Sequence, residues 1–162
     1  MHTSNMPAVG MVGSSGREAV KAFLRMSGGR ANCYHITDRH RTGPRINVLV
    51  ATEASPVLSN IIPNLSRDDY LVVNADDKTI FPLLSQSRAT LITYGFNARA
   101  CITASSVTED GLQVCIQRAF HGMDGIERLP QEFSAKVSCE ENSDNVLAAA
   151  AALAVINHSL PE

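Results

Sequence analysis

The stretch VGMVGSSGREAVKAFL at residues 9–24 decides the fold of this chain. An apolar run at residues 8–12 leads into a turn with glycine at positions 10, 13 and 16, and Val20, Phe23 and Leu24 follow at helical spacing up to Gly28-Gly29. The pattern predicts a strand, a glycine-rich loop and a helix. Such a loop presents backbone N–H groups and a helix N-terminus to an anion. Taken alone, however, this glycine spacing favours a tight structural turn.

The chain continues as an alternation of apolar runs and short helical segments. Residues 46–51, 70–73 and 90–94 are apolar and predict strands that are buried in a parallel sheet. Residues 56–64 predict a short helix or a loop bounded by prolines, and residues 79–87 predict a helix. This alternation indicates βαβ units.

Residues 32–44 are polar and rich in Arg and His, and we expect them to be irregular. Four side chains in this segment, His35, Asp38, His40 and Arg41, resemble metal ligands in kind. Their spacing lacks the regularity of a metal site, so we favour a solvated loop over a metal centre.

The pattern changes after residue 95. Residues 100–107 and 112–117 flank Glu109-Asp110-Gly111, which predicts a β-hairpin, and residues 133–137 predict one further strand. An alanine-rich helix is expected over residues 145–157, with Ser143 or Asp144 as its cap.

Together these elements predict a single domain over residues 1–162 with a three-layer α/β fold. We expect a P-loop-like, mostly parallel sheet flanked by helices, with a small antiparallel addition near residues 100–118. A chain of 162 residues is long enough to bury a core of this kind.

Composition excludes several classes of protein. A formal net charge of −2 and scattered Lys and Arg residues argue against nucleic acid or an anionic membrane as partner. The longest apolar run, residues 146–156, is too short to span a bilayer, and no secretory signal is visible, so we expect a soluble, cytoplasmic protein. The four cysteines form no CxxC pair, and we expect Cys101 and Cys115 to pack in the core.

Three separated stretches, taken in order, resemble the central domain of the Mur ligases. The opening stretch is similar to the family's G-x-x-G-x-x-G-K-T-T loop and helix. The stretch YLVVNADDKTIFPLLSQSRATLITYG at residues 70–95 is similar to the family's N-x-D-D segment and the strand that follows it. The stretch DNVLAAAAALA at residues 144–154 is similar to the H-N-x-x-N-A-x-A-A helix. The predicted hairpin lies between the second and third stretches, as in that domain.

The resemblance implies a nucleotide site that holds ATP and Mg²⁺. In this family ATP phosphorylates a carboxylate, and an amine then displaces the phosphate. The resemblance places Glu53 at the Mg²⁺-linked glutamate, although a structural role for Glu53 is an equal alternative. It places the nucleotide at Gly13, Ser14, Ser15, Gly16, Arg17, Glu18, Asn74, Asp77 and Asn145.

Several residues depart from the family pattern. Arg17 stands in place of the P-loop Lys, Glu18 in place of the following Thr, Asp144 in place of the His, and Ala148 in place of the second Asn. We also expect the family's longer metal-holding segment between residues 53 and 70, and both flanking domains, to be missing. Phosphoryl transfer depends on positioning and on charge stabilisation, so the resemblance with these departures implies a degenerate P-loop and no catalytic residue.

The residues Asp76-Asp77 allow two interpretations. They could form a paired-carboxylate site, but we favour a polar turn in which Asp77 caps the next helix. Because open α/β sheets bind ligands at the carboxyl ends of their strands, Asn74 and Asp77 remain candidates for a cleft.

Three functions follow from this reading. The first is a non-catalytic module that acts in binding or regulation, with a nucleotide, another small molecule or a partner protein as its ligand. The second is an ATP-dependent amide-bond ligase, or one subunit of a split ligase, and cell-wall synthesis enters through the resemblance. The third is an assembly role, in which a homo-oligomer buries the alanine-rich helix.

Overall fold

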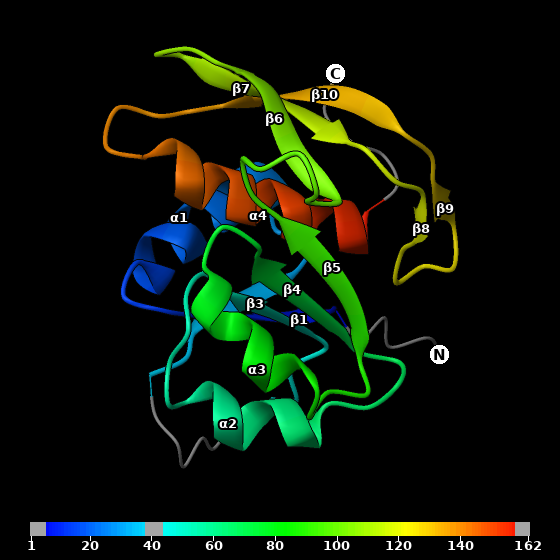
Figure 1. Cartoon of the computed structure of the whole chain (residues 1–162). Coiled ribbons are helices and arrows are strands. Elements are labelled where there is room, and N and C mark those ends of the chain that lie inside the picture. Colours follow the sequence, from blue (N-terminus) through cyan, green and yellow to red (C-terminus); the bar gives the residue numbers. More distant parts are fainter. Residues whose placement is uncertain (1–5, 38–43, 158–162) are drawn as a thin grey trace, which may run out of the picture.

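The central parallel strands of an eight-stranded sheet lie between two layers of helices (Figure 1). The computed structural model describes residues 6–37 and 44–157. Every neighbouring pair from β2 to β6 is parallel, and β7 and β10 extend the sheet in antiparallel fashion. The α/β fold with an antiparallel addition is therefore confirmed. In spatial order the strands are β2 (Asn32–His35), β1 (Ala8–Val12), β3 (Val48–Ala51), β4 (Tyr70–Asn74), β5 (Thr90–Tyr94), β6 (Ile102–Val107), β7 (Gly111–Ile116) and β10 (Gln131–Lys136).

Helices cover both faces of the central strands. The helices α1 (Gly16–Ser27) and α4 (Ser143–Ile156) pack on one face, and α2 (Leu58–Ile61) and α3 (Phe81–Leu84) lie on the other with the 3₁₀ turns η1 (Ile62–Asn64) and η2 (Lys78–Ile80). The strand β3 is buried throughout, and its alternate residues enter the two cores. This two-sided burial explains the continuous apolar runs of the sequence.

The prediction that residues 32–44 are irregular is wrong for residues 32–35. Residues Asn32–His35 form β2, the edge strand that pairs in parallel with β1. All four side chains of β2 are at least partly exposed, so the strand has no apolar run to reveal it. The other proposed metal ligands of this segment, Asp38, His40 and Arg41, lie outside the described residues.

The predicted hairpin and the strand after it are present as β6, β7 and β10. A second, smaller sheet, which was not predicted, is made by β8 (Phe120–His121) and β9 (Glu127–Arg128). Strands of two residues carry no periodicity that a pattern could reveal.

The helix α4 lies at the centre of the core. Residues 146–155 are each at most 1% exposed, against α1 on one side and the sheet on the other. Its cap is Asn142, whose side chain accepts a hydrogen bond from the backbone N–H of Asn145, and not Ser143 or Asp144 as expected. Because the chain itself buries this helix, the expectation that a homo-oligomer buries it is wrong. Among the helices of the described residues, none has both the length and the apolar character to cross a bilayer.

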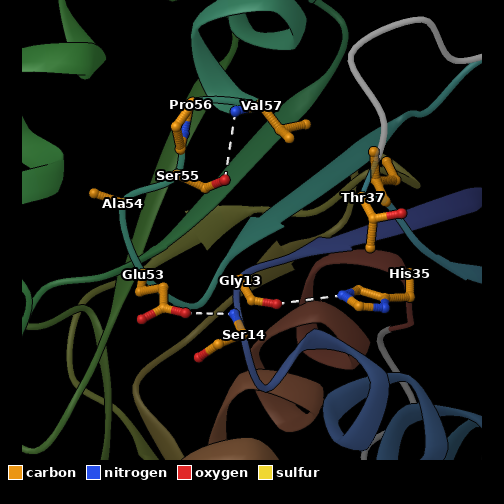
Figure 2. A pocket seen from close by; sticks show the side chains of 10 residues that line it. Gly13, Ser14, His35, Thr37, Glu53, Ala54, Ser55, Pro56 and Val57 are labelled. Atoms are coloured by element: carbon orange, nitrogen blue, oxygen red, sulfur yellow. Dashed lines mark hydrogen bonds between the residues drawn. The ribbon is translucent and has the colours of Figure 1, made fainter.

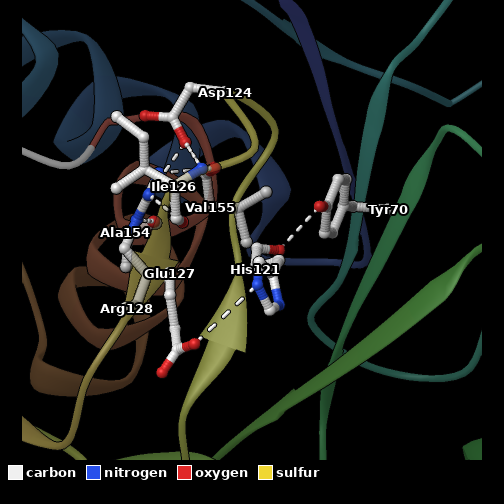
Figure 3. A network of polar contacts seen from close by, with 8 residues as sticks. All are labelled: Tyr70, His121, Asp124, Ile126, Glu127, Arg128, Ala154 and Val155. Carbon is white, nitrogen blue, oxygen red and sulfur yellow. Dashed lines mark hydrogen bonds and ion pairs between the residues drawn. The ribbon is translucent and has the colours of Figure 1, made fainter.

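Arg128 closes the carboxyl end of α4 (Figure 3). The guanidinium is 1% exposed, and it donates to the carbonyls of Ala154 at 2.7 Å and Val155 at 3.1 Å. It also donates to Asp124 Oδ1 at 2.8 Å, which compensates its charge. A cation at this helix end satisfies carbonyls that lack helical partners, and it fastens the small sheet to the core.

The cysteines are free thiols that differ in burial. Cys101 is partly buried and packs against the core on the α4 side, as expected. Cys115 is also partly buried, but it lies outside both core clusters, so the expectation of core packing does not hold for it. Burial raises the pKa of the Cys33 thiol to about 12, which makes this side chain a poor nucleophile at neutral pH.

Candidate functional site

The loop between β1 and α1 lies at the carboxyl edge of the parallel strands. Gly13 adopts a φ of +134°, and a Cβ at this position would come within 2.0 Å of Thr52 Oγ1. The Thr52 hydroxyl in turn donates to the carbonyl of Val12 at 2.9 Å. A Cβ at Gly16 would come within 2.5 Å of the His35 ring. These two glycines thus allow the loop to pack against β3 and β2.

Glu53 holds the loop from the other side (Figure 2). It follows β3, and its Oε1 accepts a hydrogen bond from the backbone N–H of Ser14. In anion-binding loops, such backbone N–H groups point at the bound anion. Here an acid of the same chain takes that position. This contact is the main electrostatic feature of the site.

His35 is a site residue that the sequence analysis assigned to a solvated loop. Its Nε2 lies 3.2 Å from the carbonyl oxygen of Gly13, so this nitrogen carries the proton and donates. In the neutral ring Nδ1 is then an acceptor. No local pattern marks His35, because only the pairing of β2 with β1 brings it to the loop.

A pocket of about 380 Å³ opens between the loop, β2 and the segment after β3. A second pocket, of about 330 Å³, shares Ala54, Ser55 and Pro56 with the first and extends toward α3. Both lie where open α/β sheets bind ligands. The first is lined by Gly13, Ser14, His35, Ile36, Thr37, Glu53, Ala54, Ser55, Pro56 and Val57.

The structure gathers only part of the proposed nucleotide site around this pocket. Gly13, Ser14 and Glu53 line it, and Ser15 and Gly16 continue the same loop. The remaining proposed residues do not line it: Arg17, Glu18, Asn74, Asp77 and Asn145.

Arg17 and Glu18 occupy the exposed side of the first turn of α1. Within the described part of the chain, neither side chain makes a hydrogen bond or ion pair. Asn145 lies in the first turn of α4, where it is 3% exposed. Helix formation and packing therefore account for the positions of Arg17, Glu18 and Asn145 without a bound ligand.

Asp76 and Asp77 each organise backbone after β4. Asp76 accepts hydrogen bonds from the backbone N–H groups of Phe96 at 2.7 Å and Asn97 at 3.2 Å. Asp77 caps η2 by accepting from the backbone N–H of Thr79 at 3.0 Å, which agrees with the predicted polar turn. Its hydrogen bond from the Thr79 hydroxyl, together with those from backbone N–H groups, lowers the pKa of the Asp77 carboxyl.

Glu53, the residue that the resemblance assigns to Mg²⁺, is engaged in a hydrogen bond within the protein. No cluster of three or more His, Cys, Asp or Glu side chains suited to a metal occurs among residues 6–37 and 44–157. Glu53 bonds to the loop, and Asp77 Oδ2 accepts from the backbone N–H of Ala54 at 3.0 Å. The Asn74 amide donates to the carbonyl of Thr52 at 3.1 Å. These oxygens and nitrogens tie neighbouring loops together instead of converging on one point.

A mostly parallel sheet flanked by helices, with a glycine loop after its first strand, defines a three-layer α/β fold. Solved Mur ligases share this fold. MurF from Acinetobacter baumannii superposes with a TM-score of 0.59 at 11% identity, covering 94% of this chain and 43% of the other. MurF from Thermotoga maritima in complex with ADP gives 0.58 at 13% identity, with 92% and 44% covered. A pseudomurein peptide ligase type C from Methanothermus fervidus gives 0.59 at 17% identity, with 97% and 48% covered.

These likenesses establish a Mur-ligase-like fold. The chain spans less than half the length of these solved structures. No protein-family model matches the sequence, and no curated protein matches it either.

Proposed function

We propose that this chain is a non-catalytic binding module on a Mur-ligase-like fold, with a degenerate phosphate loop. The hydrogen bond from Ser14 N–H to Glu53 supports this proposal most directly. A nucleotide phosphate would have to displace the carboxylate from the donor that both would use. The two anions would also repel each other at short range.

The first turn of α1 supports the same proposal. Arg17 offers a planar guanidinium where a phosphate loop uses the point charge of a Lys, and Glu18 offers a carboxylate where a hydroxyl would bind the metal. Phosphoryl transfer is catalysed almost entirely by positioning and by cationic charge. A loop with these substitutions therefore lacks the groups that transfer would need.

Calorimetric titration of the full chain with ATP, with and without Mg²⁺, tests the proposal. We expect no saturable heat in either titration and no release of phosphate. The variant Arg17→Ala should behave as the unchanged chain does. Tight, Mg²⁺-dependent ATP binding, with hydrolysis that disappears in Arg17→Ala, would overturn the proposal.

The second candidate is an ATP-dependent amide-bond ligase, or one subunit of a split ligase. The fold shared with MurF from Thermotoga maritima, whose structure contains ADP, favours this candidate. Copurification with a chain that carries an amino-acid-binding domain, together with ATP turnover by the pair, would select it.

Both candidate functions imply a cytoplasmic location. The organisation of residues 1–162 as a single domain remains a prediction.

A further inference from the structure

The pocket beside the β1–α1 loop uses several of its own hydrogen-bond donors within the protein. The backbone N–H of Ser14 donates to Glu53, and that of Ala54 donates to Asp77 Oδ2 at 3.0 Å. These are the groups that an anionic ligand would seek. Two further N–H groups of the lining are also paired, those of Ile36 with the carbonyl of Met11 at 2.9 Å and of Val57 with Ser55 Oγ at 3.4 Å.

The polar groups that remain in the lining include one charged acceptor, the Glu53 carboxylate. Among the described residues that line the pocket, Glu53 is the one carboxylate, and none is Lys or Arg. His35 uses Nε2–H on the carbonyl of Gly13, which leaves Nδ1 as an acceptor in the neutral ring. The hydroxyls of Thr37 and Ser55 can both accept and donate. The charge of Glu53 therefore favours a ligand with a cationic group that donates hydrogen bonds.

The size and the apolar part of the lining limit the body of that ligand. Ile36, Pro56 and Val57 contribute apolar surface, and the volume of about 380 Å³ lies near the lower end of the usual range for small-molecule sites. Among the described residues that line the pocket, the His35 imidazole is the one aromatic ring. A compact aliphatic body suits these walls better than a flat aromatic ring system.

We propose that this pocket binds a small molecule with a protonated amine or amidine on a compact apolar body, and that the cationic head pairs with Glu53. The inference rests on the proposed function, in which no nucleotide phosphate occupies the loop. An ammonium group donates to the carboxylate and complements its charge. A carboxylate on the ligand would face the carboxylate of Glu53, and the two negative charges would repel each other. The pocket therefore selects against anionic ligands.

Three isosteric probes test this charge preference on the full chain: cyclohexylmethylamine, cyclohexylmethanol and cyclohexanecarboxylate. Backbone amide shifts in ¹H–¹⁵N spectra report where each probe binds and how tightly. We expect the amine to shift the amides of Ser14, Ala54 and Val57, with weaker shifts from the alcohol and none from the carboxylate.

The variant Glu53→Gln keeps the size of the side chain and an oxygen that accepts from Ser14, so it removes the charge with little change in shape. We expect the amine to bind at least about tenfold more weakly to it. Glu109→Gln, in the exposed turn between β6 and β7, is the matched control and should bind as the unchanged chain does. Carboxylate binding as strong as amine binding, unchanged affinity in Glu53→Gln, or no shift at all would overturn the inference.

The same samples titrated with ATP and Mg²⁺ separate this inference from the proposed function. Absence of both amine and ATP binding would overturn the inference and leave the proposed function standing. Mg²⁺-dependent ATP binding at the Ser14 amide with release of phosphate would overturn the proposed function, and such binding without release of phosphate would overturn only the inference.

Discussion

The backbone N–H of Ser14 donates a hydrogen bond to the carboxylate of Glu53, across 39 positions of the sequence. The bond joins the loop after β1 to the segment after β3, because these two strands are neighbours in the sheet. A glycine loop that other α/β proteins leave open to a phosphate is thereby held by an acid of the same chain.

Replacing Glu53 with Ala should open the loop to anions. We expect affinity for inorganic pyrophosphate to rise by about fivefold or more, since the change frees the Ser14 N–H and removes a like charge. Calorimetry at low ionic strength measures this gain, with Glu109→Ala as the control for a general loss of negative charge. Equal gains in the two variants would show that the carboxylate does not block the loop.

Replacing Gly13 with Ala should destabilise the fold by about 2–3 kcal/mol. The added Cβ would meet Thr52 Oγ1, and the residue would have to keep a φ of +134°. Gly28→Ala is the control, because Gly28 also has a positive φ, of +58°, but open space around it; its cost should be about 1 kcal/mol. Urea unfolding compares the two, and similar losses would mean that Thr52 does not crowd position 13.

Replacing Arg128 with Met should cost about 3–5 kcal/mol of stability. The change leaves the carbonyls of Ala154 and Val155, and the carboxylate of Asp124, without a buried cationic partner. The exposed Arg118→Met is the control and should stay within about 0.5 kcal/mol of the unchanged chain.

Hydrogen exchange gives a local readout of the same substitution. The backbone N–H of Met123 donates to the carbonyl of Val155 at 2.8 Å, so its exchange should accelerate in Arg128→Met. Unchanged protection at Met123 would mean that Arg128 does not fasten the small sheet to α4.

The stability of the chain should fall in acid partly through Asp77. Its pKa lies below the ordinary value of 3.8 in the folded chain, so its contribution is complete above that value and disappears as the pH falls through the folded pKa. Urea unfolding of Asp77→Asn should therefore differ from the unchanged chain most at pH 7. The difference should shrink steadily below about pH 4. A difference that stays constant down to pH 2 would contradict the assignment.

The elements that could be predicted are those whose burial leaves a local pattern. The strands β1, β3 and β4 are buried on both faces and appear as continuous apolar runs. The helix α1 has one apolar side and ends at Gly28, which adopts the left-handed conformation that glycine favours. The hairpin of β6 and β7 was visible from its turn residues.

The elements that could not be predicted depend on partners elsewhere in the chain. The strand β2 is partly exposed and exists because β1 offers it a free edge. The cap of α4 is Asn142. The sequence alone does not select it, because the neighbouring Ser143 and Asp144 cap helices about equally well. The burial of Arg128 follows from its place beneath the end of α4, and nothing in its neighbouring residues indicates it.

The sequence by itself determined the α/β class, the glycine loop and the presence of Arg17 and Glu18 after it, because periodicity, turn chemistry and residue identity are local properties. Only the tertiary structure decided that Glu53 and His35 meet the loop at Ser14 and Gly13. The physical reason is the order of the strands: β1 lies between β2 and β3, and packing across the whole sheet sets that order.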